Sequence, residues 1–326
     1  MINRQNYHDI KSYLNYMENI QQAEKSTIKR AWSHLRHLLE WADEKPFPRS
    51  PSITPTFPTY LVNYVSNGKR LAPSTIVKCL TQARQFYAYA KTAWQSRYKT
   101  ISDTWIASLK PNRKIRSNPG LRNHKFYTLD QVMKIAEYDT TNLHLKRAKI
   151  AVAMLFCSGM RADALASLPI SCVDLENNCI LQFPEMGVRT KNYKSSITYL
   201  LPINPLLELI REWDEMVRYF PEYCLWYSPI SRDNSRLIPT TVAYQGRNST
   251  IQKDVRLICK TVGVAYLSPH KLRHGHVMYA IQHAKTIKDL KAISANVMHS
   301  SLVVTDQIYG VLQDIDVKNF ITSLEN

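Results

Sequence analysis

The sequence predicts a mainly α-helical protein with a small β-sheet, folded as two domains. Apolar residues recur three and four positions apart through most of the chain, which indicates amphipathic helices. Two runs near the middle, 172–183 and 196–201, are instead rich in Ile, Val, Leu, Tyr and Thr, which is typical of strands. The length of 326 residues and the hydrophobic content of 44% suit about two globular domains with substantial cores.

The first domain is expected to span residues 1–112 as a compact bundle of four or five helices. The apolar face of its second helix contains Ile28, Trp32, Leu35 and Leu39. Five prolines between residues 46 and 58 interrupt the helical pattern, and an Asn-Gly pair ends a short helix. The predicted helices are residues 5–20, a helix that begins after Ser26, Tyr60–Val65, a helix that begins at Pro73, and Asp103–Leu109.

A basic linker is expected at residues 113–125. The stretch Lys110–Lys125 contains six Lys or Arg residues and no acid, together with two prolines and one glycine. It has no helical or strand periodicity, which is typical of a segment between domains. Because its positive charge lies where two domains would meet, we expect it to contact a polyanion such as DNA.

The second domain is expected to span residues 126–326. Thr128 and Gln131 form a capping-box pattern that begins a helix, and Ser158-Gly-Met-Arg161 ends the next one. A basic turn, Val188–Lys194, separates the two predicted strands. The further predicted helices are Leu143–Cys157, Pro205–Tyr219, Ser249–Val262, Lys271–Ala284, Ile287–Val297 and Asp314–Leu324.

The charge of the chain indicates a polyanionic partner. The formal net charge is +17 and the pI is about 9.6, which suits nucleic acid or an acidic membrane surface. Residues 1–125 contain 21 Lys and Arg against 7 Asp and Glu, so this part is a candidate electrostatic clamp. No amphipathic segment combines a basic face with a large apolar face, which disfavours the membrane. With no signal peptide and no apolar run of about 18 residues, we expect a cytoplasmic, nucleoid-associated protein.

Other kinds of chemistry have little support in the sequence. The six cysteines form no C-x-x-C pair, so we expect buried thiols and neither a zinc site nor a disulfide framework. No glycine-rich phosphate loop is present, which disfavours nucleoside-triphosphate chemistry.

One stretch, Ser268–Tyr309, gathers residues suited to phosphate chemistry. His270 and Arg273 are three apart at a predicted helix start, hence on one face, and an arginine binds phosphate through two N–H groups. The phenol of Tyr309 is a possible nucleophile. Upstream, the basic turn offers a proton donor. Each of these residues is weak evidence by itself.

Their order is more specific. The series Arg161, Lys191, His270, Arg273, His299 and Tyr309 resembles the catalytic set of the tyrosine recombinases, the phage integrase family. The local frames agree: Phe156-Cys-Ser-Gly-Met-Arg161 is similar to the family's helix–Gly–x–Arg segment, and His270-Lys-Leu-Arg273-His to its H-x-L-R-H box. Met298-His299-Ser-Ser, followed by Thr305 and Tyr309, resembles the family's ending. The resemblance covers the whole chain.

The resemblance implies a SAM-like helical DNA-binding domain and an α+β catalytic domain. By this resemblance, Arg161 and Arg273 would hold the scissile phosphate. His270 and His299 would add hydrogen bonds, and His270 would accept the tyrosine proton. Lys191 would protonate the leaving 5′-oxygen, and Lys194 stays open as the alternative. Tyr309 would attack phosphorus and form a 3′-phosphotyrosyl bond without a metal, ATP or any other cofactor. The residues expected to bind DNA are Lys69, Arg70, Lys78, Arg84, Arg113, Lys114 and Arg116.

Some positions depart from the family's pattern. An acidic residue usually lies three positions after the first arginine, where this chain has Ala164, with Asp163 one place earlier. After His274 the chain has Gly275 and His276, where a small hydroxyl residue and an aromatic residue are more usual, and Met298 stands where a glycine usually precedes the His-Ser pair. No length is left ahead of the bundle for an arm-binding domain, which suggests the simple two-domain form found in Xer-type or Cre-like enzymes.

The expected partners are double-stranded DNA recombination sites and further copies of the chain, with accessory proteins as additional candidates. The apolar tail Gln313–Asn326 is expected to dock on a neighbouring protomer in a homotetramer on DNA. Two alternatives stay open: a catalytically inactive DNA-binding relative, and a type IB topoisomerase-like or telomere-resolving enzyme. The filled catalytic positions disfavour the first, and the compact length and helical first domain disfavour the second. Integration of a mobile element is the first expectation for the biological outcome.

Overall fold

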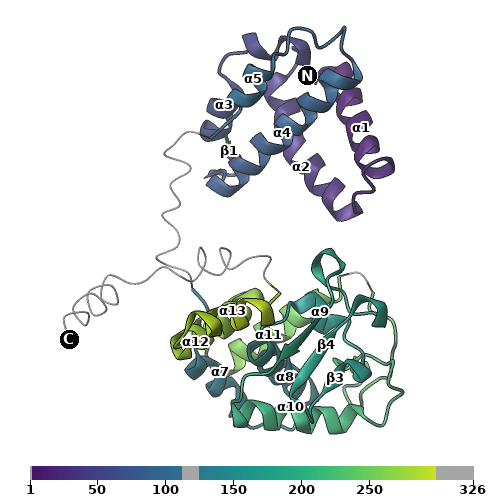
Figure 1. Ribbon diagram of the computed structural model, residues 1–326, viewed down its shortest axis with the longest axis vertical. Helices are drawn as coiled ribbons and strands as arrows, with labels where there is room; N and C mark the ends of the chain where they lie inside the picture. Colours follow the sequence, from purple (N-terminus) through teal and green to yellow (C-terminus); the bar gives the residue numbers. More distant parts are fainter. Residues whose placement is uncertain (1, 112–124, 245, 299–326) are drawn as a thin grey trace, which may run out of the picture. The chain divides into compact units, whose positions relative to one another are not determined.

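A computed structural model describes residues 2–111, 125–244 and 246–298 (Figure 1). The chain divides into two compact units, Met1–Pro119 and Gly120–Asn326. The predicted linker falls almost entirely outside the described residues, as do the predicted helix Asp314–Leu324 and the tail that contains it. Within the described ranges, no helix is both long enough and apolar enough to cross a membrane.

The first unit is a helical bundle, as predicted. Helix α2 packs against α1, α3 and α4, and α4 also contacts α5. Leu35, Leu80, Phe86 and Tyr87 are fully buried between these helices, which is the arrangement that the three- and four-residue spacing predicts. The helices are α1 (Arg4–Asn19), α2 (Lys25–Ala42), α3 (Phe57–Asn63), α4 (Pro73–Ala93) and α5 (Asp103–Ser108), with a 3₁₀ segment η1 (Phe47–Ser52).

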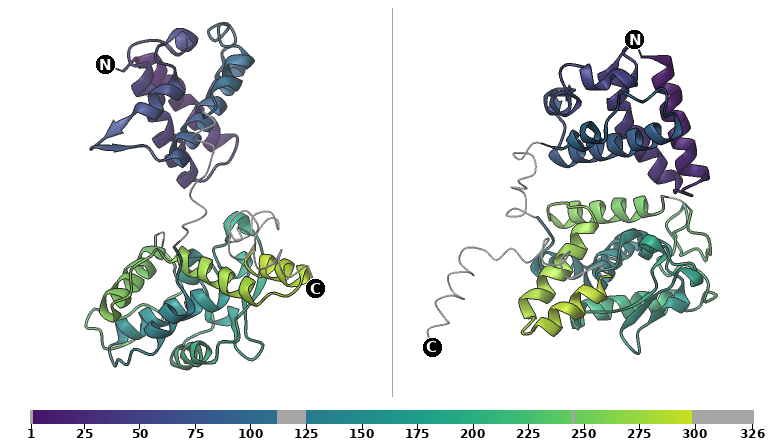
Figure 2. Two further views of the ribbon diagram at one scale, coloured as in Figure 1. Left: turned by 90° about the vertical axis from the view of Figure 1, so that its left-hand side faces the viewer. Right: turned by 45° about the horizontal axis from the view of Figure 1, so that its top comes forward.

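A two-stranded hairpin follows α3, and the prediction of a helix through Val65 was wrong. Strand β1 (Val65–Ser66) pairs antiparallel with β2 (Lys69–Arg70), and the hairpin stands out from the bundle (Figure 2). The two residues between the strands, Asn67 and Gly68, have φ values of 50° and 72°. A two-residue turn with both φ values positive is the one whose twist matches paired strands, and Asn-Gly is its preferred sequence.

The second unit is organised around α8, which contacts α7, α9, α10, α11 and α12. From Ala148 to Ser158 every residue of α8 except Lys149 is buried, because other helices surround it. The Thr128–Gln131 capping box is present at α7, as predicted. The helices are α7 (Leu129–Ala136), α8 (Leu143–Ser158), α9 (Ala162–Ala166), α10 (Asn204–Val217), α11 (Asn248–Val262), α12 (His270–His283) and α13 (Ile287–Asn296).

The sheet of the second unit has three antiparallel strands in the order β3-β4-β5, at one side of the helices (Figure 1). The strands are β3 (Val173–Asp174), β4 (Cys179–Gln182) and β5 (Ser196–Tyr199). The single strand predicted over 172–183 is therefore two strands. The chain reverses between them because the Asp174 carboxylate accepts from Asn177 N at 3.0 Å and Asn178 adopts a φ of 48°.

A buried ionic network joins α8 to α11. The guanidinium of Arg147 donates to both carboxylate oxygens of Asp254, at 2.9 and 3.2 Å, and the Tyr227 hydroxyl donates to the same carboxylate. Burial raises the pKa of Tyr227 well above its usual value, and the Asp254 charge adds to that rise. This network fixes α11 against the central helix α8.

Tyr127 attaches the segment before α7 to the start of α12. Its hydroxyl donates to Leu267 O and accepts from Leu267 N, both at 2.7 Å, and its backbone N donates to Lys271 O at 3.4 Å. Opposite it, a Cβ on Gly275 would lie 2.1 Å from Tyr127 O. Only a glycine allows α12 to approach this backbone so closely.

Candidate active site

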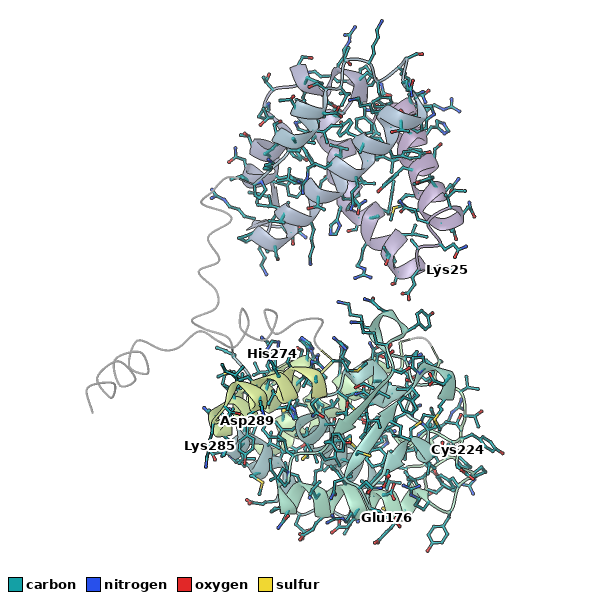
Figure 3. All side chains as sticks on the ribbon, viewed as in Figure 1. Lys25, Glu176, Cys224, His274, Lys285 and Asp289 are labelled. Carbon is teal, nitrogen blue, oxygen red and sulfur yellow. The ribbon has the colours of Figure 1, made fainter. Side chains whose placement is uncertain are left out.

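Three of the predicted catalytic residues meet at the carboxyl end of α8. Arg161, the N-cap residue of α9, follows the end of α8 after two residues, and His270 is the first residue of α12. Arg273 lies one turn further along α12, with the neighbouring His274 labelled in Figure 3. His299 and Tyr309 fall outside the described residues, as do Arg113, Lys114 and Arg116.

Arg273 is held by two backbone carbonyls. Its side chain is 2% exposed and donates to Gly159 O at 2.7 Å and to Val297 O. Gly159 ends α8 in the left-handed conformation, with a φ of 63°, which turns its carbonyl out of the helix. The arginine therefore links the end of α8 to the end of α13, close in sequence to His299, and places a permanent positive charge there.

Arg161 makes no such bonds within the part of the chain that the structure describes. Burial lowers the pKa of its guanidinium, which remains protonated at neutral pH. Among the described residues no carboxylate pairs with it, because Asp163 instead forms an ion pair with Arg189 at 3.0 Å. The acidic support that the family's pattern would supply is therefore not provided by Asp163. A partly buried guanidinium of this kind suits an anion from outside the chain.

His270 is a candidate proton acceptor. Desolvation lowers its pKa, and the positive charges of Arg273, Arg161 and Lys271 lower it further. Its ring lies edge-on to that of His274, with centroids 4.8 Å apart. A neutral imidazole with one unprotonated nitrogen can accept a proton from a phenol.

His276 is a buried neighbour whose role the sequence did not reveal. It is 1% exposed, and its Nδ1 lies 2.8 Å from Phe156 O. Burial lowers its pKa to about 4, and Arg273 contributes in the same direction. A Cβ on Gly159 would lie 2.7 Å from its ring. His276 thus packs as a neutral side chain behind the bend that presents Gly159 O to Arg273.

Asn296 is a second residue that sequence reasoning missed. At the end of α13 its side chain accepts from Tyr199 N at 2.7 Å and donates to Tyr199 O at 3.0 Å. The Thr198 hydroxyl also donates to Asn296 O. The side chain occupies the edge of β5 as a neighbouring strand would, so it attaches α13 to the sheet three residues before His299.

Lys191 and Lys194 lie in the connection between β4 and β5, residues 183–195. Both are exposed, and they flank Asn192 and Tyr193, whose φ values are 61° and 52°. Neither lysine has a hydrogen bond or ion pair with the residues that the structure describes. The choice between them stays a prediction.

The basic residues predicted to bind DNA in the first unit have two environments. Lys69 and Arg70 lie on the projecting β2 strand and are exposed, and so is Lys78 on α4. Arg84 is half-buried and donates to Thr81 Oγ1 at 3.3 Å. The first three are available to phosphate groups, whereas Arg84 has a local partner.

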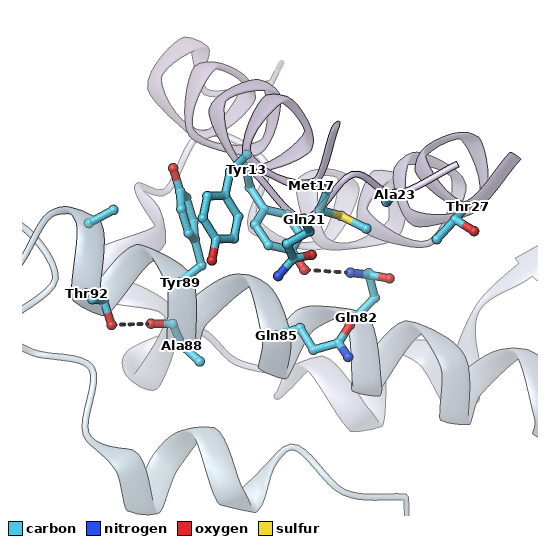
Figure 4. A pocket seen from close by; sticks show the side chains of 12 residues that line it. Tyr13, Met17, Gln21, Ala23, Thr27, Gln82, Gln85, Ala88, Tyr89 and Thr92 are labelled. Atoms are coloured by element: carbon cyan, nitrogen blue, oxygen red, sulfur yellow. Dashed lines mark hydrogen bonds between the residues drawn. The ribbon is translucent and has the colours of Figure 1, made fainter. Parts of the chain in front are cut away.

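A pocket of about 830 Å³ lies in the first unit, and none of these basic residues lines it (Figure 4). It is lined by side chains of α1, the start of α2, and α4, where Gln82 donates to the Tyr13 hydroxyl at 3.0 Å. None of the predicted catalytic residues belongs to it.

The described ranges contain no cluster of three or more His, Cys, Asp or Glu side chains arranged to hold a metal ion. All six cysteines are buried as free thiols. Burial raises the pKa of Cys157 to about 12, so this thiol is a packing group and not a reactive thiolate.

Comparisons with known proteins place the chain in one family. Residues 125–314 match the model of the phage integrase family. The tyrosine recombinase XerC of Alcanivorax borkumensis is 25% identical over 243 residues, which cover 72% of this chain and 68% of that protein. The XerH site-specific recombinase bound to a palindromic difH substrate has the same fold, with a TM-score of 0.63, 16% identity and coverage of 97% and 84%. The Tn1549 transposon integrase in complex with transposon right-end DNA also has this fold, with a TM-score of 0.62 and 14% identity. The match covers 98% of this chain and 99% of that one.

Proposed function

The chain belongs to the phage integrase family, the tyrosine recombinases, and on that premise we propose that it is a site-specific DNA recombinase that cleaves and rejoins strands through a 3′-phosphotyrosyl intermediate. The observation that carries the proposal is the meeting of Arg161, His270 and Arg273 at the carboxyl end of α8, inside the matched region. Two guanidinium groups and a neutral imidazole at one place suit a phosphodiester anion.

The proposed reaction begins with attack by the Tyr309 hydroxyl oxygen on phosphorus. The tyrosine proton passes to His270, the P–O5′ bond breaks, and Lys191 gives a proton to the departing 5′-oxygen. Arg161 and Arg273, with His299, stabilise the added negative charge of the five-coordinate phosphorus. A 5′-hydroxyl from a partner strand then reverses these steps. The phosphotyrosyl bond retains the energy of the phosphodiester, so neither ATP nor a metal is required.

The first unit is proposed to hold the DNA duplex. Lys69 and Arg70 on the projecting hairpin and Lys78 on α4 would contact phosphates, together with Arg113, Lys114 and Arg116 of the linker. Such contacts fix the position of a protein on DNA without reading its sequence. We further propose that four copies assemble on two recombination sites, with the tail Gln313–Asn326 of each docked on a neighbour. Accessory proteins, nucleoid association and the outcome of recombination remain part of this proposal.

The test is formation of a covalent adduct. Duplexes that bind the full chain are first selected from a random-sequence library, then nicked next to the reactive phosphate so that religation is prevented. We expect a protein–DNA adduct that survives denaturation, forms in the presence of EDTA, and is absent for Tyr309→Phe. The exposed Tyr219→Phe is the matched control and should react normally. Tight binding of a selected duplex without any adduct would indicate an inactive DNA-binding relative instead.

A further inference from the structure

We propose that Arg189 is a positioning residue that sets the place of the general-acid lysine relative to Arg161. The inference rests on the proposed function, because it assigns a role within the same reaction. It concerns the connection between β4 and β5, whose exposed part carries both candidate lysines.

Within the described ranges, Arg189 is the last residue before the lysines that is hydrogen-bonded to the body of the unit. Its backbone N donates to Ser167 Oγ at 2.8 Å, and its guanidinium donates to Ala243 O at 3.0 Å and Tyr244 O at 3.3 Å. Every residue from Lys191 to Ser195 is exposed. The position of the lysine turn therefore depends on this attachment at its base.

The same guanidinium reaches α9, the helix whose N-cap residue is Arg161. One of its nitrogens lies 3.0 Å from Asp163 Oδ1 in the first turn of α9. Asp163 is two residues after Arg161, and Arg189 is two residues before Lys191. The ion pair thus joins the short segments that carry the phosphate-binding arginine and the proton donor. On this view the Asp163 carboxylate pairs with Arg189, and not with Arg161, because it serves to join these two segments.

The Arg189–Asp163 ion pair is expected to contribute little to the stability of the fold. The Arg189 and Asp163 side chains are 30% and 47% exposed, and pairs so open to solvent contribute little to folding. Two of the partners of Arg189 are loop carbonyls at residues 243 and 244, so the arginine orders loops and not the core. A small displacement of a reacting group slows catalysis far more than it affects folding.

Proton donation to the leaving oxygen gives a selective measurement. If the 5′-bridging oxygen is replaced by sulfur, the P–S bond breaks without a proton, because a thiol is a much stronger acid than an alcohol. Tyrosine attack and charge stabilisation by the arginines are still required. A residue that acts through the lysine matters for the oxygen substrate only, whereas a residue needed for folding or DNA binding matters for both.

The experiment compares cleavage of selected duplexes with oxygen or sulfur at the scissile 5′ position, using the full chain. For Asp163→Asn and Arg189→Gln we expect cleavage of the oxygen duplex to slow about 10- to 100-fold, with duplex affinity unchanged. On the sulfur duplex both variants should react within about twofold of the parent rate. Arg218→Gln is the matched control, since Arg218 also joins a carboxylate, that of Asp214 at 2.6 Å, to a backbone carbonyl. It should react normally on both duplexes.

Each outcome is decisive. Equal losses on the two duplexes, or no loss on the oxygen duplex, overturn the positioning role of Arg189 while the proposed recombinase stands. A parent protein that forms no adduct on either duplex overturns the proposed function, and the positioning role falls with it.

Discussion

Arg273 and Gly159 are joined by a hydrogen bond of 2.7 Å in which a buried guanidinium donates to the carbonyl at the end of α8. The bond depends on backbone geometry, since Gly159 has a φ of 63°. It also depends on space, because His276 and Val297 occupy the volume that a side chain at this position would need. The left-handed C-cap of α8 therefore positions the carbonyl that holds Arg273.

Gly159→Ala should destabilise the second unit by about 2–4 kcal/mol and impair DNA cleavage, because its Cβ would lie 2.7 Å from the His276 ring and 2.9 Å from Val297 Cγ1. Gly263→Ala is the matched control. Gly263 ends α11 with a φ of 72°, and a Cβ added there would have no neighbouring atom within 4 Å. Only the cost of the left-handed backbone conformation, about 1 kcal/mol, therefore applies. Urea denaturation compares the two, and equal losses would show that crowding at Gly159 is absent.

The pH dependence of stability should report His276. Its pKa in the folded protein, about 4, lies below the unfolded value of about 6.5. The unfolded state therefore binds the proton first as the pH falls, and the free energy of unfolding decreases between pH 6.5 and 4 by up to about 3 kcal/mol. Above pH 6.5 this contribution is fully present. His276→Gln should flatten the profile in that window.

The control for this measurement lies on the same helix. His283 also has its Nδ1 2.8 Å from a backbone carbonyl, that of Tyr279, but it is exposed. His283→Gln should leave the slope between pH 4 and 6.5 unchanged. If His276→Gln and the parent gave the same slope, His276 would not be the buried titrating group.

The Arg147–Asp254 pair should show strong coupling. Arg147→Met alone leaves the Asp254 carboxylate buried without its partner. Asp254→Leu alone leaves the Arg147 guanidinium buried without its partner. Each single variant should lower the free energy of unfolding by about 3–5 kcal/mol. The double variant removes both charges and should be much more stable than the sum of the two losses implies. A double-mutant cycle by chemical denaturation measures this, and additive losses would contradict the coupling.

DNA binding should depend on salt through the projecting hairpin. Neutralising Lys69 and Arg70 together, as Gln variants, should reduce the slope of log affinity against log salt concentration by about 2, since each phosphate contact contributes about 0.9. Lys285→Gln with Lys288→Gln changes the net charge equally on the other unit and should leave the slope as it is. An unchanged slope for the hairpin variant would exclude phosphate contacts there.

Cleavage of duplexes with an oxygen or a sulfur leaving group should distinguish the roles of the two lysines of the β4–β5 connection. Lys191→Ala is expected to slow cleavage of an ordinary duplex by at least about 100-fold, the usual contribution of a general acid, and to recover with a 5′-sulfur leaving group. Lys194→Ala should weaken binding without this recovery. The reverse pattern would assign proton donation to Lys194.

Much of the fold could be predicted because its signals are local. The spacing of apolar residues predicted α2 and α8, and the Thr128–Gln131 pair predicted the start of α7. The hairpin at Asn67-Gly68 was missed because the same dipeptide also ends helices. The run 172–183 was interpreted as one strand because of its Val, Leu and Ile residues, although Asp174, Asn177 and Asn178 within it favour a turn.

The support of the site could not be predicted in the same way. Arg161, His270 and Arg273 were found from motifs, each within a few residues of sequence. The bonds that support the site join distant positions: Asn296 attaches α13 to Tyr199 across 97 residues, and Arg273 contacts Gly159 across 114. Spacing along a chain does not encode such contacts, although the position of Arg189 just before Thr190-Lys191 was a visible hint.

The bonds of Tyr127 bear on how the molecule can be divided. Its hydroxyl is fastened to Leu267, and its carbonyl lies against Gly275 of the helix that carries His270 and Arg273. A fragment that begins at the first helix of the second unit, Leu129, would therefore lack a brace of the catalytic helix, and inactivity of that fragment would say nothing about the need for the first unit. Truncations meant to isolate the chemistry should retain residues from 125 onward.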